Sequence, residues 1–395
     1  MSGAEFGMTV LPGTVPQNYS YPTFAEVDYY KSKGMNFIRL PFRWERWQHT
    51  NFATLDATEL GRAHPFIAYA TSKGMAVLID PHNFMRYYPN PRSDYQTSTD
   101  GLVGSSVPDA VFTNFWSQVA AIYKTNNLVF FGLNNEPANM STDTLVVSEN
   151  AAITAIRDTG ATNLIFVPGN GYTGAWTWTQ NYYGTANSLD MIKIVDPGSN
   201  FVFEAHQYLD QDGSGTTTNI YGGTGVGPAR LSTFTQWLRV HHYTGFLGEF
   251  ALANNTIGGT GQGGATLTNM LSYIQTNSDV WLGWAWWGGG PSWGNYMYSI
   301  EPTSLGKANQ ADRPVMGVVK HFFPFPSAAL RITNSTQLSF TPAQGFIYQL
   351  QSSSDLSAWN PSGAPFAGSG NVTNISLPVS GNSSGFYRIS VGHAP

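Results

Sequence analysis

Short apolar runs alternate with longer amphipathic segments along the first 300 residues. Seven runs have the unbroken apolar character of strands buried on both faces, and they lie at 36–41, 76–81, 128–133, 164–167, 201–205, 245–247 and 280–286. Six segments between them have helical periodicity, at 25–33, 55–73, 110–124, 145–158, 229–241 and 265–277. This alternation predicts an α/β fold with a parallel sheet, and a closed (β/α)8 barrel fits the length better than an open sheet.

The pattern changes after Pro326. The remaining residues are rich in Ser, Thr, Asn and Gly, with short alternating runs at 337–341, 346–351, 372–377 and 385–391. Turn signals about ten residues apart are typical of a β-sandwich. We therefore expect two domains, a catalytic barrel over residues 1–325 and a small β-sandwich module of unknown role over 326–395.

The composition limits which classes of molecule the protein is expected to bind. Charged residues make up only 11% of the chain and aromatic residues 14%, with a net charge of −5. Without a basic patch or a long apolar run, nucleic acid and membranes are not expected partners. The chain has no cysteine, so neither a thiolate nor a disulfide is available. We expect a soluble monomer that handles neutral ligands; residues 1–7 show no export signal.

Polar side chains follow the predicted strands, where a parallel barrel places its ligand-binding residues. They are Arg39, His82, Asn83, Asn134, Asn135, Glu136, His206, Tyr208 and Glu249. Glu136 and Glu249 stand at the ends of two different strands, and a pair of carboxyl groups can hydrolyse a glycosidic bond, with or without an intervening water. Either glutamate alone could instead cap a helix or pair with an arginine. The two together, among Arg, His and Tyr at other strand ends, favour the catalytic interpretation.

The residues also resemble a known family over positions 3–302. The matching motifs include Gly-Ala-Glu-Phe-Gly at 3–7, Asp-Pro-His-Asn at 80–83, Gly-Leu-Asn-Asn-Glu-Pro at 132–137, Glu-Ala-His-Gln-Tyr at 204–208, Gly-Glu-Phe at 248–250 and Trp-Ala-Trp-Trp at 284–287. In this order they are similar to the endo-β-1,4-glucanases of glycoside hydrolase family 5, of the fungal type. The resemblance implies cleavage of cellulose and related β-1,4-glucans with retention of configuration.

The resemblance also implies residue roles. Glu136 would be the general acid/base and Glu249 the nucleophile. Asn135 would bind the 2-hydroxyl of the reacting sugar, whereas Arg39 and Tyr208 would orient Glu249 and keep it ionised. His82 and His206 would complete the site, and Trp287 would lie under the reacting sugar.

A neutral glucan must be bound through hydroxyl groups and aromatic rings, which suits the excess of aromatic residues. We expect Trp178, Trp287 and Trp293 to contact the substrate. No cofactor or metal is expected: the Asp-rich segment 210–215 lacks the final glutamate of a calcium loop, and His241–His242 lacks a further ligand.

Two alternatives to an endo-β-1,4-glucanase remain open. The substrate could be β-mannan or another β-1,4-linked polysaccharide, because hydroxyl contacts decide this. The first strand of the family's barrel is apparently truncated here, since only Met1 and Ser2 precede the Gly3 motif. If that opens the barrel, the chain could be a catalytically weak carbohydrate-binding protein. An enzyme acting on such a polymer is expected outside the cell.

Overall fold

The computed structural model describes residues 1–88, 98–258, 261–324, 330–334, 337–343, 346–377 and 386–393. These residues form two compact units. The first unit consists of Met1–Val27 and Asn36–Val319, and the second of Asp28–Met35 with the described residues from Lys320 onward. The domain boundary predicted at 325/326 lies outside the described residues.

The first unit is built on a parallel sheet of seven strands, each hydrogen-bonded to the next in sequence. The strands are β1 (Phe37–Phe42), β2 (Ala76–Pro81), β3 (Val129–Gly132), β4 (Ile165–Pro168), β5 (Phe201–His206), β6 (Gly245–Phe250) and β7 (Trp281–Trp286). In β2, the consecutive residues Val77, Leu78 and Ile79 are all fully buried, as expected for a strand covered on both faces. The seven predicted strands are thus confirmed, with ends that differ by a few residues.

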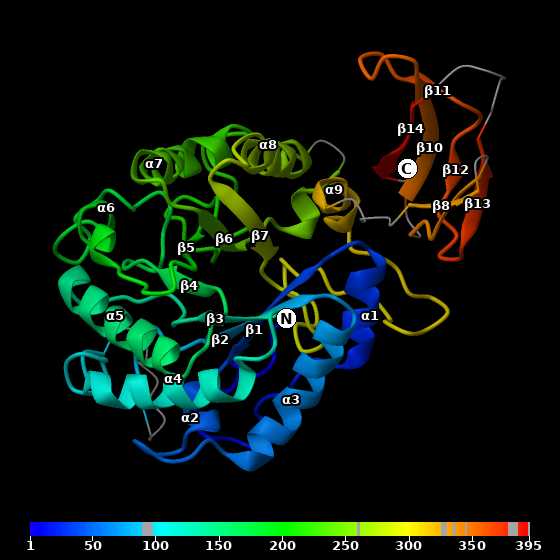
Figure 1. Ribbon diagram of the computed structural model, residues 1–395. Coiled ribbons are helices and arrows are strands. Elements are labelled where there is room, and N and C mark those ends of the chain that lie inside the picture. The colour runs from blue at the N-terminus through cyan, green and yellow to red at the C-terminus, as the bar shows by residue number, and fades with distance from the viewer. Residues whose placement is uncertain are drawn as a thin grey trace. The chain divides into compact units, whose positions relative to one another are not determined.

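Helices follow most strands and surround the sheet, as Figure 1 shows for α3, α4, α5, α7 and α8. The helices of the first unit and its border are α1 (Phe24–Ser32), α2 (Trp44–Trp47), α3 (Ala57–Ser72), α4 (Asp109–Tyr123), α5 (Thr142–Asp158), α6 (Asn187–Asp190), α7 (Val226–His241), α8 (Gly263–Thr276) and α9 (Met316–Val319), with short 3-10 turns at Met191–Lys193, Asn254–Thr256 and Lys320–Phe322. Side chains cap the N-termini of two helices. The Asp56 side chain accepts a hydrogen bond from the Glu59 N–H at the start of α3, and the Ser141 side chain accepts one from the Thr144 N–H at the start of α5. The six predicted long helices are present.

Large side chains fill the inside of the curled sheet. Leu78, Phe166, Val202 and Phe246 form a buried cluster contributed by four different strands. Phe37 packs against this cluster, with its ring centroid 4.8 Å from that of Phe246. Because strands from opposite sides of the sheet meet here, the sheet is wrapped around a packed core, as in a barrel.

The N-terminal residues lie beside both end strands of the sheet. Ala4 forms a parallel bridge with Phe42 at the end of β1, and the Ser2 N–H donates to the Gly289 carbonyl, 2.7 Å away, just beyond β7. A Cβ on Gly290 would lie 2.4 Å from the Ser2 carbonyl oxygen, so glycine permits this approach. The architecture is a barrel-like seven-stranded sheet that stays partly open, which confirms the predicted fold class.

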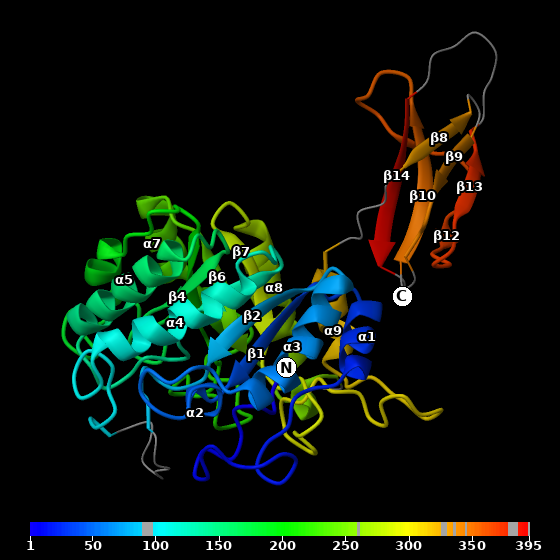
Figure 2. The same ribbon diagram turned by 60° about the horizontal axis from the view of Figure 1, so that its bottom comes forward.

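The second unit carries two antiparallel sheets. One joins β10 (Phe346–Ser353) to β11 (Asn360–Pro361), β12 (Phe366–Ala367) and β14 (Phe386–His393), and the other has the order β13 (Thr373–Ser376), β9 (Gln337–Phe340), β8 (Arg331–Asn334). Figure 2 shows β10 and β14 side by side. Phe340, Phe346 and Tyr348 form the buried cluster between them. No helix in the described parts of the chain is both long and apolar enough to cross a membrane.

Candidate active site

Arg39 stands at the centre of a group of charged side chains inside the sheet. It comes from β1 and is only 5% exposed. Its Nη2 lies 2.6 Å from Asn135 Oδ1 and 3.0 Å from Asp80 Oδ2, and its Nε lies 3.2 Å from Glu204 Oε1. Burial opposes its charge, but the surrounding carboxylates outweigh burial and raise the pKa of Arg39 further. Arg39 is therefore a permanent cation that links the ends of several strands.

Glu249, in β6, is held from two sides. Arg39 Nη1 donates to its Oε1, and the Tyr208 hydroxyl donates to its Oε2 over 2.9 Å. The residue is 4% exposed. A carboxylate that accepts a hydrogen bond from a guanidinium on one oxygen and from a phenol on the other is fixed in direction.

Glu136 follows β3 and is held differently. Its backbone φ is +45°, a left-handed conformation that is strained for a residue with a side chain. This conformation turns the chain at the end of the strand. Its Oε1 lies 2.8 Å from His206 Nδ1, and its side chain is 18% exposed. Glu136 is thus the more accessible of the two predicted catalytic glutamates.

His206 joins the two glutamates. Its Nδ1 is 3.8 Å from Glu249 Oε2 as well as 2.8 Å from Glu136 Oε1. Its Nε2 lies 3.2 Å from Glu204 Oε1. Burial disfavours a charged ring, but Glu249, Glu136 and Glu204 outweigh burial and raise the pKa of His206 to about 10. His206 is therefore an imidazolium at neutral pH.

The packing of β5 against β6 makes room for these groups. His206 pairs with Glu249 across an irregular step in the register, and Glu204 points to the same side of β5 as His206, two residues away. A Cβ on Gly248 would lie 1.9 Å from Glu204 Oε1, so only glycine fits. The glycine before Glu249 thus allows the buried carboxylate of Glu204 to approach β6.

His82 and Asn135 line the same strand ends. His82 Nδ1 lies 3.3 Å from Asp80 Oδ2, and its ring stacks on Trp287 with centroids 5.3 Å apart and an interplanar angle of 12°. Burial lowers the pKa of His82 well below its ordinary value, so the stacked ring is neutral. Asn135 is 1% exposed, and its Nδ2 has no hydrogen-bond partner. An unpaired buried donor beside Glu136 is suited to a substrate hydroxyl.

Glu136, His206 and Glu249 also belong to the residue types that bind metal ions, and their ligand atoms lie within 4.8 Å of one another. A neutral imidazole is needed to ligate a metal. In the structure these three side chains are joined by the ion pairs of His206 with the two carboxylates.

Of the three tryptophans predicted to contact substrate, two are grouped with His82 and one is not. Trp287 stacks on His82, and Trp293 packs edge-on against Trp287 with ring centroids 5.5 Å apart. Trp178 is fully buried. Its ring contacts Phe234 and Trp237 of α7, with centroids 4.5 and 5.1 Å away. The prediction for Trp178 is wrong, because this side chain anchors its loop in the core.

Sequence reasoning underrated two acidic residues and one aromatic residue of this region. The predicted site lacks Glu204 and Asp80, although each stands two residues before a candidate histidine and so shares its strand face. Trp176, 40% exposed, lies in the loop where Trp178 had been expected to meet substrate. Period-two alternation could have identified the acids, whereas nothing local distinguishes the two tryptophans.

The family model for cellulases of glycosyl hydrolase family 5 matches residues 2–290. The chain belongs to this family. Endo-β-1,4-glucanase B of Aspergillus niger is 39% identical to this family member over 302 residues, which cover 76% of this chain and 83% of that protein.

Solved structures of family members share the fold. The structure of XacCel5A in complex with cellopentaose has a TM-score of 0.74 and 38% identity, covering 82% of this chain and 97% of that one. The endoglucanase Cel5A of Pseudomonas stutzeri in complex with cellobiose has a TM-score of 0.70 and 28% identity, covering 82% of this chain and 91% of that one. The family resemblance seen in the sequence is thereby confirmed.

Proposed function

We propose that this family 5 member is a retaining endo-β-1,4-glucanase in which Glu249 is the nucleophile and Glu136 the general acid/base. The observation that carries the proposal is the spacing of the two glutamates, whose nearest carboxylate oxygens lie within 4.8 Å of each other. Retaining glycosidases place their carboxyl groups about 5 Å apart, whereas inverting enzymes need a wider gap for a water molecule. This spacing favours direct attack by a carboxylate.

In the first step, Glu249 attacks the anomeric carbon and the glycosidic bond breaks. Glu136 donates its proton to the departing sugar oxygen, so the leaving chain departs as a neutral alcohol. Arg39 and Tyr208 direct the two oxygens of Glu249, which prepares the carboxylate for attack without reorganisation. The product is a covalent glycosyl ester of Glu249.

In the second step, Glu136, now a carboxylate, takes a proton from water, and that water attacks the anomeric carbon. The ester bond to Glu249 breaks, and the sugar leaves with its original configuration. His206 contacts both glutamates. As an imidazolium it offsets part of their combined negative charge while the proton on Glu136 is exchanged.

The proposed substrate is a β-1,4-glucan chain. The free Nδ2 of Asn135 is suited to the 2-hydroxyl of the reacting sugar, and the ring of Trp287 offers an apolar face beside His82. The names of the relatives support the choice: an endo-β-1,4-glucanase from Aspergillus niger, and structures with cellopentaose and cellobiose. Because its substrate would be a polymer, we place the enzyme outside the cell, with the module after the barrel as a separate domain of open role.

The test is the release of reducing ends from soluble β-1,4-glucan and from β-mannan, with Glu249→Gln as control. We expect glucan cleavage by the wild type, none by the control, and a product that initially has the β configuration when followed by proton NMR. Preferential cleavage of mannan would change the substrate but not the mechanism. Initial release of the α anomer would overturn the retaining mechanism, and no cleavage by a cooperatively folded protein would leave a binding protein.

A further inference from the structure

The hydroxyl of Tyr208 donates to one oxygen of Glu249, although Tyr208 itself lies beyond the end of β5. Burial, and after it the charges of Glu249 and Glu136, raises the pKa of Tyr208 well above its ordinary value. The side chain therefore stays a phenol that can donate. Its hydroxyl can direct Glu249 only if the ring is held in place, so the groups that hold the ring bear on the proposed nucleophile.

The loop at 210–217 packs directly on the ring of Tyr208. A Cβ on Gly215 would lie 2.6 Å from Tyr208 Cδ1, which is too close for two carbon atoms that are not bonded. The φ of Gly215 is +71°, a left-handed conformation that favours glycine. Glycine at this position thus allows the backbone of the loop to lie against the ring.

Asp210 fixes this loop from the inside. Its side chain is buried, its Oδ1 accepts from the Gly215 N–H over 3.0 Å, and its Oδ2 accepts from the N–H groups of Thr216 and Thr217 over 3.1 and 3.2 Å. A carboxylate accepts through both oxygens and so satisfies all three donors. An amide in its place would accept through one atom only, and its NH2 group would face a donor.

Tyr298 holds the end of the loop and the ring of Tyr208 at the same time. Its hydroxyl donates to the Thr217 carbonyl over 2.7 Å. Its ring is nearly parallel to that of Tyr208, with centroids 6.0 Å apart and an interplanar angle of 22°, and both rings belong to one buried cluster. The backbone of Tyr298 is bound in turn, because Trp286 Nε1, at the end of β7, donates to its carbonyl over 2.9 Å. Tyr298 thus ties the loop to β7.

Arg230, on α7, fixes the backbone where the loop begins. It is buried, its Nη1 donates to the Tyr208 carbonyl over 2.6 Å, and its Nη2 donates to the Gln211 carbonyl over 3.2 Å. Hydrogen bonds to a charged donor are stronger than those between neutral groups. Both the backbone and the ring of Tyr208 are therefore restrained.

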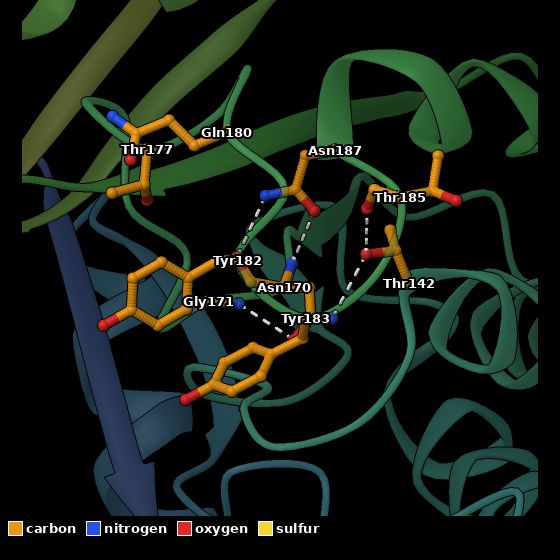
Figure 3. A pocket seen from close by; sticks show the side chains of 9 residues that line it. All are labelled: Thr142, Asn170, Gly171, Thr177, Gln180, Tyr182, Tyr183, Thr185 and Asn187. Atoms are coloured by element: carbon orange, nitrogen blue, oxygen red, sulfur yellow. Dashed lines mark hydrogen bonds between the residues drawn. The ribbon is translucent and has the colours of Figure 1, made fainter.

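The loop after β4 is also fixed by a buried side chain. Figure 3 shows a small pocket of this loop in which Asn187 Oδ1 accepts from the Asn170 N–H and Asn187 Nδ2 donates to the Asn170 carbonyl, over 2.9 Å in each case. The Thr142 hydroxyl donates to the Thr185 carbonyl over 2.6 Å. Because these polar groups bind one another, the pocket stabilises its own loop. Asp210 differs in that its loop lies on a ring whose hydroxyl donates to Glu249.

We propose that Asp210 and Tyr298 are positioning residues for attack by Glu249: they fix the loop at 210–217 on the ring of Tyr208 and so hold its hydroxyl on Glu249. The proposal rests on the assignment of Glu249 as the nucleophile. Attack on the anomeric carbon requires one direction of the carboxylate, and a small misplacement of a reacting group slows the reaction strongly. Neither side chain changes a bond in the reaction, since both act through Tyr208.

The test is a double-mutant cycle with Tyr208→Phe, measured by steady-state hydrolysis of cellopentaose. Tyr208→Phe removes a hydrogen bond to a charged group, and we expect it to lower kcat about ten- to hundredfold. Asp210→Asn and Tyr298→Phe should each lower kcat about fivefold and change KM less than about twofold, because they disturb attack and not binding. In the Tyr208→Phe background the same substitutions should lower kcat by less than about a further twofold, because no hydroxyl is left to position.

Asp212→Asn is the matched control, the same substitution in the same loop. Asp212 is exposed, and its Oδ1 accepts from the N–H and the hydroxyl of Ser214 over 3.1 and 2.8 Å. This variant should change neither constant. Cellobiosyl fluoride is the second substrate, because fluoride departs without a proton from Glu136. Variants that disturb attack by Glu249 should lose about the same factor in kcat/KM on the fluoride as on cellopentaose.

Unchanged kcat in both variants, or equal losses with and without the Tyr208 hydroxyl, would overturn the proposal while wild-type cleavage still upheld the glucanase function. A higher KM at unchanged kcat would also overturn it, because the loop would then bind the substrate itself. If Asp210→Asn does not fold, Tyr298→Phe completes the same cycle, since it keeps the ring and removes one hydroxyl. Absence of wild-type cleavage overturns both proposals.

Discussion

Glu249 and Glu136 lie close together, with carboxylate oxygens within 4.8 Å of each other, but in different surroundings. Glu249 is part of a strand, is 4% exposed and accepts hydrogen bonds from Arg39 and Tyr208. Glu136 lies after its strand at a positive φ, with an 18% exposed side chain. In the described part of the chain its carboxylate has one hydrogen-bond partner, His206.

This difference matches the two chemical tasks that we propose for Glu249 and Glu136. A nucleophile must keep one charge and one direction, which a permanent guanidinium and a phenol provide. An acid/base must gain and lose a proton in each turnover, and Glu136 is paired with a histidine, which can itself exchange a proton, and not with a guanidinium. The proposed nucleophile Glu249, whose charge should stay constant, is paired with Arg39 and Tyr208. The proposed acid/base Glu136, whose charge must change, is paired with His206.

The largest expected effect comes from removing the charge of Glu249. Glu249→Gln keeps the shape of the side chain but cannot form the ester, so we expect a loss of at least about 10⁴-fold in kcat on every substrate. Cellobiosyl fluoride should not be hydrolysed either, because leaving-group ability does not replace the nucleophile. Turnover of the fluoride at near the wild-type rate would show that another group attacks the sugar.

Removing the proton of Glu136 should have a smaller effect that depends on the substrate. Glu136→Gln should lower kcat for cellopentaose by about 10²- to 10⁴-fold, the range for general acid–base catalysis. Formation of the glycosyl-enzyme from cellobiosyl fluoride should be nearly normal, because fluoride departs without protonation. Single-turnover measurements separate this step from the slower hydrolysis of the ester, and equal losses for both substrates would contradict the assignment.

The positions of the two glutamates can be predicted from the sequence, for a physical reason. Strands buried on both faces are continuous apolar runs, so the seven strands were recognisable, and a parallel sheet gathers the residues at their ends. Glu136 and Glu249 were therefore found by position alone. Their different surroundings depend on Arg39, 210 residues from Glu249 in sequence, and no local pattern carries that pairing.

Trp176 and Trp178 show where local reasoning fails. The two residues share one turn, yet Trp176 is 40% exposed and Trp178 fully buried. Burial of Trp178 depends on Gly169, where a Cβ would lie 2.3 Å from the indole, and on the aromatic face of α7. Tertiary packing, and not the local sequence, decides which of the two rings is buried.

The burial of Trp178 leads to a prediction about the loop that borders Glu136. Trp178→Ala should lower the free energy of unfolding by about 3–5 kcal/mol, as for other large aromatic truncations in a core. Trp176→Ala should change it by less than about 1 kcal/mol, since the side chain is largely at the surface. Urea unfolding of both variants against the wild type measures the difference. Equal, small changes would mean that the loop is not anchored through Trp178.

The last prediction concerns His206, the group that the two glutamates share, and its effect depends on pH. The carboxylates raise the pKa of His206 from 6.5 to about 10, so the folded state holds this proton more tightly than the unfolded chain. The resulting stabilisation is fully present below pH 6.5 and is lost as the pH rises toward about 10. The wild type should therefore exceed His206→Gln in free energy of unfolding by an amount that shrinks steadily across this interval. Urea unfolding of both proteins at several pH values would measure it. Subtracting one free energy from the other removes the titration of groups that both proteins share. A difference independent of pH would mean that His206 stays neutral between the glutamates, and the balance of charge proposed for the second step would then have to come from Arg39 alone.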